Sequence, residues 1–282
     1  MTATPLRIAT CKPLPEPDPD EAPLAAALAA GGFAAELLAW DDPAADWDAP
    51  IPTILRSTWN YPLAIDAFRA WIDRASAAAL LINPPDVVRD NLHKRYLLAL
   101  EARGVPIIST HYRERGQAIS DWTAPWDEVV VKPVIGASSV GVGQFRLPQQ
   151  RLQMEQHATR LLEQTGVLFQ RYEPSVRTEM ERSLVFIAGA CSHAVRRIPF
   201  NLGSTPDTDE FDHRASVEEI QLARRVLAAA GADGAPYARV DLLPTSQGLV
   251  LMELELIDPA LFLTRRPAAA AELAAALVAC VR

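Results

Sequence analysis

Glu253 and Glu255 lie two residues apart in an otherwise apolar segment, Leu249–Leu263. Side chains two apart on a β-strand share one face, so both carboxylates would project from the same side. A buried carboxylate without a partner is costly or takes up a proton. The pattern therefore requires either a solvated strand face or a cation beside these acids. Asp258 lies beyond the predicted strand, beside Pro259, and is assigned to turn structure or substrate contact.

A second segment, YARVDLLP, supplies an arginine and a further acid two residues apart, Arg239 and Asp241. The sequence TSQG after it has the composition of a turn. If the two strands pair antiparallel, Asp241 lies near Glu253, with Arg239 on the same face. Converging carboxylates suit Mg²⁺ or Mn²⁺, and a neighbouring arginine suits a phosphate. The alternative is an edge strand whose polar face is simply solvated.

The stretch EVVVKPVIGASSVGVGQF, Glu128–Phe145, combines a lysine with a loop of small residues. It predicts a strand that ends near Lys132, a loop, and a second strand. Small residues leave backbone N–H groups free to face an anion, and hydroxyls add donors; the loop residues concerned are Gly136, Ser138, Ser139 and Gly141. A Walker A loop is not matched because the lysine precedes the loop, and no GxGxxG opens a helix. A flexible hairpin with a salt-bridged lysine is the alternative.

A polar and aromatic cluster, RSTWNYP, follows a predicted strand near the N-terminus. Such residues at a strand end often bind ligand, and the candidates for substrate contact are Arg56, Ser57, Thr58 and Asn60. An ordinary loop anchored by aromatic residues is the alternative. The five histidines are scattered without the spacing of zinc ligands, so a catalytic zinc site is not expected.

Composition limits the classes of protein to consider. The 282 residues carry a formal charge of −8, which argues against nucleic acid as the default partner because phosphate binding requires clustered Lys and Arg. The three cysteines are far apart and form no CxxC pair. No signal-peptide core and no membrane-length apolar run is present. A cytoplasmic protein with no membrane partner is expected.

The surrounding elements alternate between strand and helix. Strands at 6–11, 33–40 and 52–57, with helices at 20–31 and 64–77, predict a small Rossmann-like α/β domain with a mostly parallel sheet. Asp20 is expected to cap the first helix. One helix is expected from about 90 to Gly104, capped by Asp90 or Asn91. Ser216 and Glu219 form a capping box. The overall expectation is a mixture of α/β and α+β structure.

Together these features resemble the ATP-grasp superfamily, over roughly Asn91 to Leu263. The resemblance implies two α+β lobes that clamp ATP, and an acyl phosphate intermediate that an amine attacks. It implies a pre-ATP-grasp domain at 1–88, a small lid subdomain at 89–172 and a large catalytic subdomain at 173–282. Monomer and homodimer both remain open.

The residues that carry the resemblance can be matched one by one. Lys94 in NLHKRYL and Lys132 in VVVKP stand where the family has its two phosphate lysines. LFQRYEP matches the hinge that holds adenine, at Gln170, Arg171, Tyr172 and Glu173. Glu181 is the candidate ribose-binding acid, with Glu179 as its rival. RVD…ELELIDP resembles the catalytic block of D-alanine ligases and glutathione synthetases, which implies Arg239 and Lys132 as catalytic residues and Asp241, Glu253 and Glu255 as ligands of two Mg²⁺ ions. The family usually has Asn at the last of these positions.

Within the superfamily, RSTWNYP, SLVF…SHAVRRIP and MELELIDPALFL resemble a bacterial group that includes the cyclo-ligase converting O-ureido-D-serine to D-cycloserine. Arg197 resembles a substrate- or phosphate-contacting arginine. A glycine-rich stretch of that group is replaced here by FNLGSTPDTDEFDH, which is expected near the substrate. The resemblance implies an ATP-dependent carboxylate–amine ligase for a small amino-acid-like substrate, acting between molecules or by ring closure. A ligase for peptide or protein termini and a non-catalytic ATP-binding module are the alternatives.

Overall fold

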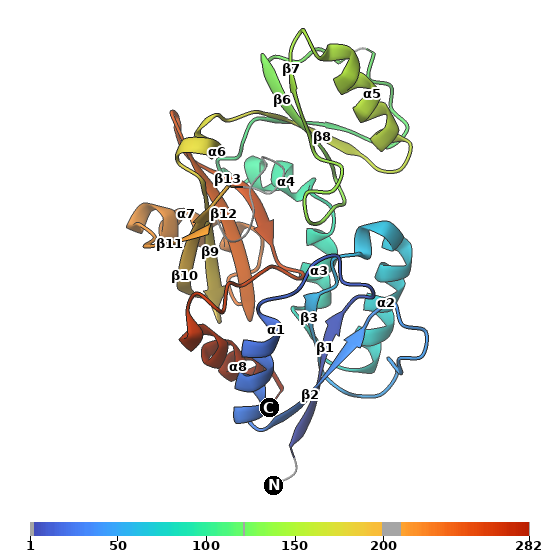
Figure 1. Cartoon of the computed structure of the whole chain (residues 1–282), viewed down its shortest axis with the longest axis vertical. Coiled ribbons are helices and arrows are strands. Elements are labelled where there is room, and N and C mark those ends of the chain that lie inside the picture. The colour runs from blue at the N-terminus through green and yellow to red at the C-terminus, as the bar shows by residue number, and fades with distance from the viewer. Residues whose placement is uncertain (1–2, 121, 199–209, 282) are drawn as a thin grey trace.

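The computed structural model describes residues 3–120, 122–198 and 210–281. Its strands form three sheets, which Figure 1 shows as separate layers along the long axis of the molecule. The segment at 199–209, most of the predicted substrate-proximal stretch FNLGSTPDTDEFDH, lies outside the described residues. Within the described ranges no helix is long and apolar enough to cross a membrane.

The first sheet is parallel, in the order β2-β1-β3-β4. Its strands are β1 (Thr4–Thr10), β2 (Phe33–Ala39), β3 (Thr53–Ser57) and β4 (Leu81–Ile82). Around it lie α1 (Glu21–Ala30), the short 3-10 helix η1 (Tyr61–Ala64) and α2 (Ile65–Ala78). Helices cover both faces: Leu24 and Leu28 of α1 pack in one apolar cluster, while Phe68 and Ile72 of α2 pack in another. Both faces being covered explains why β3 is buried throughout.

The second sheet is antiparallel, in the order β5-β8-β6-β7. Its strands are β5 (Thr110–Arg113), β6 (Glu128–Pro133), β7 (Gly143–Arg146) and β8 (Val167–Arg171). Helix α5 (Arg151–Leu162) covers one face through Met154, Ala158 and Leu162. The small-residue loop joins β6 to β7, as the sequence predicts.

The third sheet is antiparallel, in the order β11-β10-β9-β12-β13. Its strands are β9 (Glu181–Ile187), β10 (Ala190–Arg197), β11 (Glu210–His213), β12 (Tyr237–Thr245) and β13 (Gly248–Glu255). Short helix α6 (Ser175–Thr178) precedes it, and α7 (Val217–Ala229) and α8 (Pro267–Val281) complete this region. The predicted hairpin of β12 and β13 is confirmed, with Asp241 opposite Glu253 and Arg239 opposite Glu255.

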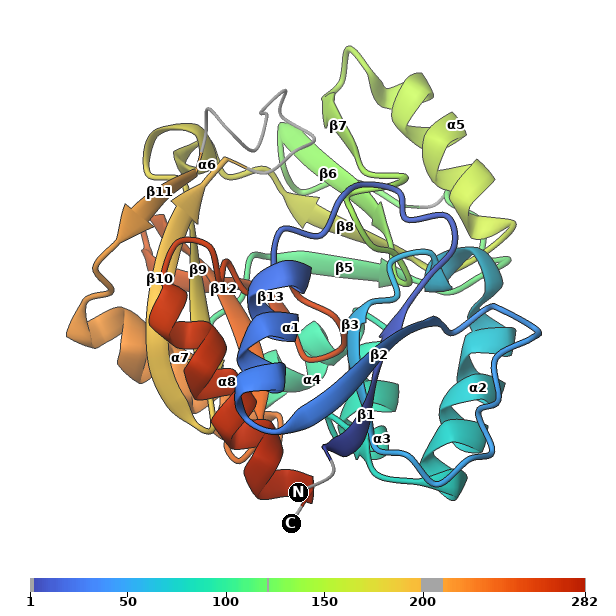
Figure 2. The same ribbon diagram turned by 60° about the horizontal axis from the view of Figure 1, so that its bottom comes forward.

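The first and third sheets share one apolar core. Leu273 and Leu277 of α8 lie in the same cluster as Leu24 of α1, Ile8 of β1 and Val185 of β9. Figure 2 shows α8 packed alongside α1. The C-terminal helix therefore joins the N-terminal α/β region to the third sheet, which positions the loops between them.

The single helix expected from about 90 to Gly104 is wrong. The chain forms α3 (Pro85–Asn91) and α4 (Tyr96–Ala102) with a break between them. At the break the Lys94 N–H donates to Val134 O at 2.7 Å. Asn91 does not cap a helix start: its amide group donates to Leu254 O and accepts from Leu256 N, both at 2.9 Å. The Asn91 side chain thus binds the backbone at the outer edge of β13, as a neighbouring strand would. This contact joins distant parts of the chain, so local sequence cannot predict it.

Asp20 also differs from its predicted role. Its side chain makes no capping hydrogen bond to α1. Instead its two carboxylate oxygens accept from the backbone N–H groups of Leu261 and Leu263, at 2.6 and 2.7 Å. Asp20 therefore anchors the segment after β13 to the start of α1. The capping box of Ser216 and Glu219 is confirmed.

Candidate active site

A cavity of about 350 Å³ lies where the three sheets meet. Lys132 and the β6–β7 loop line it from the second sheet, and Arg239, Asp241 and the acids of β13 line it from the third. From the N-terminal region the connection between β1 and α1 contributes Glu16, Pro17 and Pro19. The regions of all three sheets thus contribute residues to the lining, so the shape of the cavity depends on how the sheets pack against each other.

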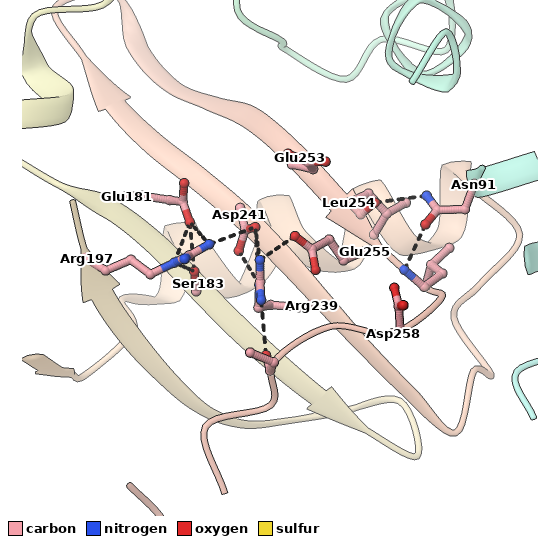
Figure 3. Close-up of polar contacts among 12 residues, drawn as sticks. Asn91, Glu181, Ser183, Arg197, Arg239, Asp241, Glu253, Leu254, Glu255 and Asp258 are labelled. Carbon is pink, nitrogen blue, oxygen red and sulfur yellow. Dashed lines mark hydrogen bonds and ion pairs between the residues drawn. The ribbon is translucent and has the colours of Figure 1, made fainter. Parts of the chain in front are cut away.

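Arg239 lies at the centre of the charged residues in the cavity (Figure 3). Its Nε donates to Asp241 Oδ1 and its Nη2 to Asp241 Oδ2, both at 2.9 Å. Nη2 also pairs with Glu255, and Nη1 donates to Ala260 O at 3.2 Å. Burial alone would raise the pKa of Asp241, but the charges of Arg239 and Arg197 lower it below its usual value. The guanidinium thus keeps Asp241 ionised.

Lys94 forms an ion pair with Glu253. Burial lowers the pKa of Lys94, while the charges of Glu255 and Asp241 oppose that shift. Each of the three acids predicted to bind metal is therefore paired with a cationic side chain. Within the described residues, no three Asp, Glu, His or Cys side chains gather closely enough to surround a metal ion by themselves.

Lys132 contrasts with Lys94. No carboxylate of the described residues forms an ion pair with it. Burial and the neighbouring charge of Lys94 lower the pKa of Lys132 to about 7, with Glu181 acting in the opposite direction. The loop after it adopts positive φ at Ser138 (49°) and Ser139 (56°), a conformation that costs of order 1 kcal/mol per residue and is often found at functional sites. A partly buried lysine beside such a loop is suited to an anionic ligand.

The predicted nucleotide residues converge on the cavity, with one exception. Those that line it are Lys94, Lys132, Gly136, Ser138, Ser139, Gln170, Arg171, Tyr172, Glu173 and Glu181. Gly141 does not, although its neighbours Val140 and Val142 do. The hinge side chains are held in place, because Gln170 donates to Thr110 Oγ1 at 2.9 Å and Arg171 donates to Glu173 at 2.6 Å.

Glu181 and Glu179, the two rivals for the ribose, occupy different environments. Glu181 lines the cavity and its Oε1 accepts from Arg197 Nε at 2.9 Å and from Ser183 Oγ at 3.0 Å. Burial raises the pKa of Glu181, and the charge of Arg197 opposes that rise. The side chain of Glu179 is 55% exposed and pairs with Arg182. The position of Glu181 in the cavity therefore favours it over Glu179 as the candidate for binding the ribose.

Among Arg56, Ser57, Thr58, Asn60 and Arg197, the residues expected to hold the substrate, Arg197 lines the cavity and the other four do not. Arg56 and Ser57 belong to the buried strand β3, where Arg56 pairs with Asp20 at 3.4 Å and Ser57 donates to Thr10 Oγ1 at 2.9 Å. Asn60 binds Asp41 and Trp40. Arg56 and Ser57 face the interior because helices cover both sides of the first sheet, whereas Asn60 follows β3 and is half-buried.

Thr58 is buried as well, and it donates to Asp258 Oδ2 at 2.6 Å. Asp258 itself lines the cavity, together with Trp59 and Tyr61. The expected cluster RSTWNYP thus reaches the cavity through its two aromatic residues, while Thr58 acts through Asp258. Sequence reasoning also missed Glu16 and the proline-rich connection that carries it; its only signal was the acidic, proline-rich composition of PLPEPDPD.

Comparisons with known proteins identify the family of the chain. The family model for the N-terminal domain of D-cycloserine synthetase DcsG matches residues 6–83. The cycloserine biosynthesis protein DcsG of Streptomyces lavendulae is 33% identical over 269 residues, which cover 88% of this chain and 89% of that protein. The crystal structure of D-cycloserine synthetase DcsG superposes with a TM-score of 0.90, at 30% identity, over 99% of this chain and 100% of that one.

A RimK domain ATP-grasp protein of Sphaerobacter thermophilus has a TM-score of 0.69 at 20% identity, over 95% of this chain and 98% of the other, which shows a shared fold. The ATP-grasp fold and the resemblance to the cycloserine group are therefore confirmed. By these relationships the chain belongs to the DcsG family of ATP-grasp ligases, enzymes that use ATP and a divalent metal to form C–N bonds.

Proposed function

We propose that this ligase activates the carboxylate of a small amino acid as an acyl phosphate and closes it onto a nitrogen of the same molecule. The observation that carries the proposal is the cavity of about 350 Å³ between the three sheets, which has lysines and a loop of small residues on one wall and Asp258 with aromatic residues on another. A cavity of this size lies within the range of small-molecule binding sites. DcsG, which covers the whole fold, is named a D-cycloserine synthetase.

Lys94, Lys132 and the β6–β7 loop are assigned to the phosphates of ATP. Lys132 suits a phosphate because it is partly buried and has no ion pair within the described residues. Gly136, Ser138 and Ser139 line the same wall, and their N–H and hydroxyl groups suit phosphate oxygens. The loop would exclude water that otherwise hydrolyses an acyl phosphate. Gln170–Glu173 are assigned to adenine and Glu181 to the ribose.

Asp241, Glu253 and Glu255 are assigned to two Mg²⁺ ions, with Mn²⁺ as a substitute. The donor set fits, because Mg²⁺ is usually held by one or two carboxylates and completed by phosphate and water oxygens. Their present partners Arg239 and Lys94 supply the positive charge that these acids require. When bound, the metal supplies charge neutralisation for the transferring phosphoryl group.

Arg239 is assigned to the reacting centre. Its guanidinium is held on three sides by Asp241, Glu255 and Ala260 O, which fixes its direction before substrate binds. In that position it would stabilise the γ-phosphoryl group as the substrate carboxylate attacks, and then the tetrahedral intermediate as nitrogen displaces phosphate. Lys132 assists by balancing charge on the same phosphates.

Other parts of the sequence interpretation also remain proposals. The division into 1–88, 89–172 and 173–282 is supported by the three sheets, whose strands fall within these ranges. A cytoplasmic location and the absence of a nucleic-acid partner are inferred from composition, and the monomeric or homodimeric state from the family resemblance.

The test is direct. The purified chain is incubated with ATP, Mg²⁺ and O-ureido-D-serine, and phosphate release is measured together with D-cycloserine by mass spectrometry. We expect ring product and phosphate in equal amounts, and neither without ATP. Phosphate release that requires a second amine, or a peptide terminus, would overturn ring closure in favour of ligation between molecules.

A further inference from the structure

Asp258 lines the cavity, and the proposed function assigns it no chemical role. It follows β13 and lies beside Glu255 in Figure 3, on the side away from Glu181 and Arg197. Its Oδ2 accepts from Thr58 Oγ1 at 2.6 Å, and its backbone oxygen accepts from Trp59 Nε1 at 3.0 Å. Both bonds come from the segment after β3, so the carboxylate is fixed between the first and third sheets.

The other acids of this part of the cavity each have a cation beside them. Asp241 and Glu255 pair with Arg239, Glu253 pairs with Lys94. Within the described residues no Lys, Arg or His forms an ion pair with Asp258.

The environment of Asp258 disfavours its charged form. Burial raises its pKa to about 7, and the negative charge of Glu255 adds to this rise. The hydrogen bond from Thr58 and the charge of Arg56 act in the opposite direction but do not cancel it. A cation placed in the cavity would remove this penalty, because an ion pair favours the ionised carboxylate.

We propose that Asp258, oriented by Thr58, binds the ammonium group of the substrate and so selects amino acids over carboxylic acids that lack the amine. This inference rests on the proposed function, since it names which small carboxylate the ligase accepts. The carboxylate of Asp258 accepts hydrogen bonds from Thr58 alone among the described residues, through the hydroxyl at Oδ2 and through the backbone, and no cation of those residues pairs with it. A primary ammonium has three donors and no acceptor, which matches a carboxylate oxygen and the aromatic wall of Trp59 and Tyr61.

The position of Asp258 fits this role. Glu255 is paired with Arg239 at the reacting centre, and its charge is felt by Asp258. An ammonium held at Asp258 would therefore leave the adjoining carboxylate of the same amino acid near Arg239 and the phosphate lysines. Lys132 and Asp258, which both line the cavity and form no ion pair within the described residues, come from different parts of the chain and have opposite charges. They suit the anionic phosphate and the cationic amine respectively.

The test uses two variants and a matched control. Asp258→Asn removes the charge while its amide oxygen can still accept from Thr58, and Thr58→Val removes the hydroxyl that orients the acid. Asp66→Asn removes an acid whose side chain is 92% exposed on α2. The ligands are O-ureido-D-serine and its analogue with hydroxyl in place of the amine. Binding is measured by calorimetry with a non-hydrolysable ATP analogue and Mg²⁺ present.

For the wild type we expect the amine to bind about 10- to 100-fold more tightly than its hydroxyl analogue, the range of a charge-assisted hydrogen bond. Asp258→Asn should lose this preference while retaining affinity for the hydroxyl analogue within about threefold and for the ATP analogue within about twofold. Thr58→Val should reduce the preference, and Asp66→Asn should leave it unchanged.

Equal weakening of both ligands by Asp258→Asn would assign the residue to the turn alone and overturn the inference. Retention of the full preference would overturn it too, as would a wild type that binds neither ligand. The proposed function fails separately: if the wild type binds the amine with the expected preference but releases no phosphate, the ammonium site stands and the ligation chemistry does not.

Discussion

Asp20→Asn, which replaces one carboxylate oxygen by an amide group, is expected to destabilise the fold strongly. Asp20 is buried, and each of its carboxylate oxygens accepts one backbone N–H of the segment after β13, from Leu261 and Leu263. It is also the ion-pair partner of Arg56, whose side chain is 2% exposed. Asparagine has nearly the same shape but only one acceptor oxygen, and it has no charge.

The expected cost follows from these contacts. One N–H of Leu261 or Leu263 would face an amide NH₂ group, and a buried unsatisfied donor costs about 1–3 kcal/mol. Arg56 would lose the only ion pair that the described residues give it, and removing one partner of a buried pair costs about 3–5 kcal/mol. The two losses share one site and are not additive. We expect the free energy of unfolding to fall by about 3–5 kcal/mol in total.

The assay is equilibrium unfolding in urea followed by tryptophan fluorescence, with Asp66→Asn as the control. The control removes an exposed acid paired only at i,i+3, so its effect should stay below about 0.5 kcal/mol. Asp20→Asn should strongly lower the urea concentration at the unfolding midpoint, while the dependence of the unfolding free energy on urea concentration stays unchanged.

A double-mutant cycle separates the ion pair from the backbone contacts. Arg56→Met removes the buried cation but leaves both N–H bonds to Asp20 in place. If the charges are coupled, Arg56→Met combined with Asp20→Asn should cost less than the sum of the single variants, by about 1–3 kcal/mol. A cost below about 1 kcal/mol for Asp20→Asn alone would refute the reasoning, because it would mean that neither the N–H groups nor Arg56 depend on this carboxylate.

Three further predictions concern the cavity. Glu253→Gln should lower ATP-dependent phosphate release by at least ~100-fold, since charge stabilisation worth several kcal/mol would be lost. The urea midpoint should change little. Near-normal phosphate release would exclude Glu253 from the metal site. Because the pKa of Lys132 is lowered to about 7 and bound phosphate would raise it, ATP binding should take up a proton and weaken by up to about tenfold per pH unit above 7. Calorimetry in two buffers checks this, and Lys132→Gln should abolish the uptake. Asp258 has a pKa raised to about 7 from 3.8, so its stabilising contribution is full below pH 4 and lost as pH rises through 7. Asp258→Asn should therefore gain stability relative to wild type at pH 8 but not at pH 4, as measured by urea unfolding at both values.

Sequence alone predicted the hairpin of β12 and β13 because its signals are local. Alternating apolar residues, a turn composition and two pairs of charged residues at spacing two fix both faces and the approximate register. The observed pairing of Asp241 with Glu253 follows directly. The register shift after Asp241 was not predicted. A β-bulge adds one residue to one strand, and the alternation of apolar and polar residues does not show where this happens.

The errors come from contacts between distant parts of the chain. Asn91 and Asp20 have the residue types of helix caps, and local patterns favour that role. In the structure both side chains instead bind backbone groups of the segment 254–263. Arg56 was expected to contact substrate because polar and aromatic residues at a strand end often bind ligand. Its burial depends on helices covering both faces of the first sheet.

These errors share a physical cause that bears on the site itself. The segment from β13 to α8 carries Glu253, Glu255 and Asp258 of the cavity, and side chains from the N-terminal region bind it at three places. Asn91 holds β13 at its edge, Thr58 holds Asp258, and Asp20 holds the backbone at Leu261 and Leu263. All three come from the first 91 residues of the chain. The ligase residues of the third sheet are thus positioned by the N-terminal region, which also provides Glu16, Trp59 and Tyr61 to the cavity wall. Changes in this region should therefore alter substrate selection and the geometry of Arg239 together, because Ala260 O, a partner of Arg239, directly precedes the backbone that Asp20 anchors.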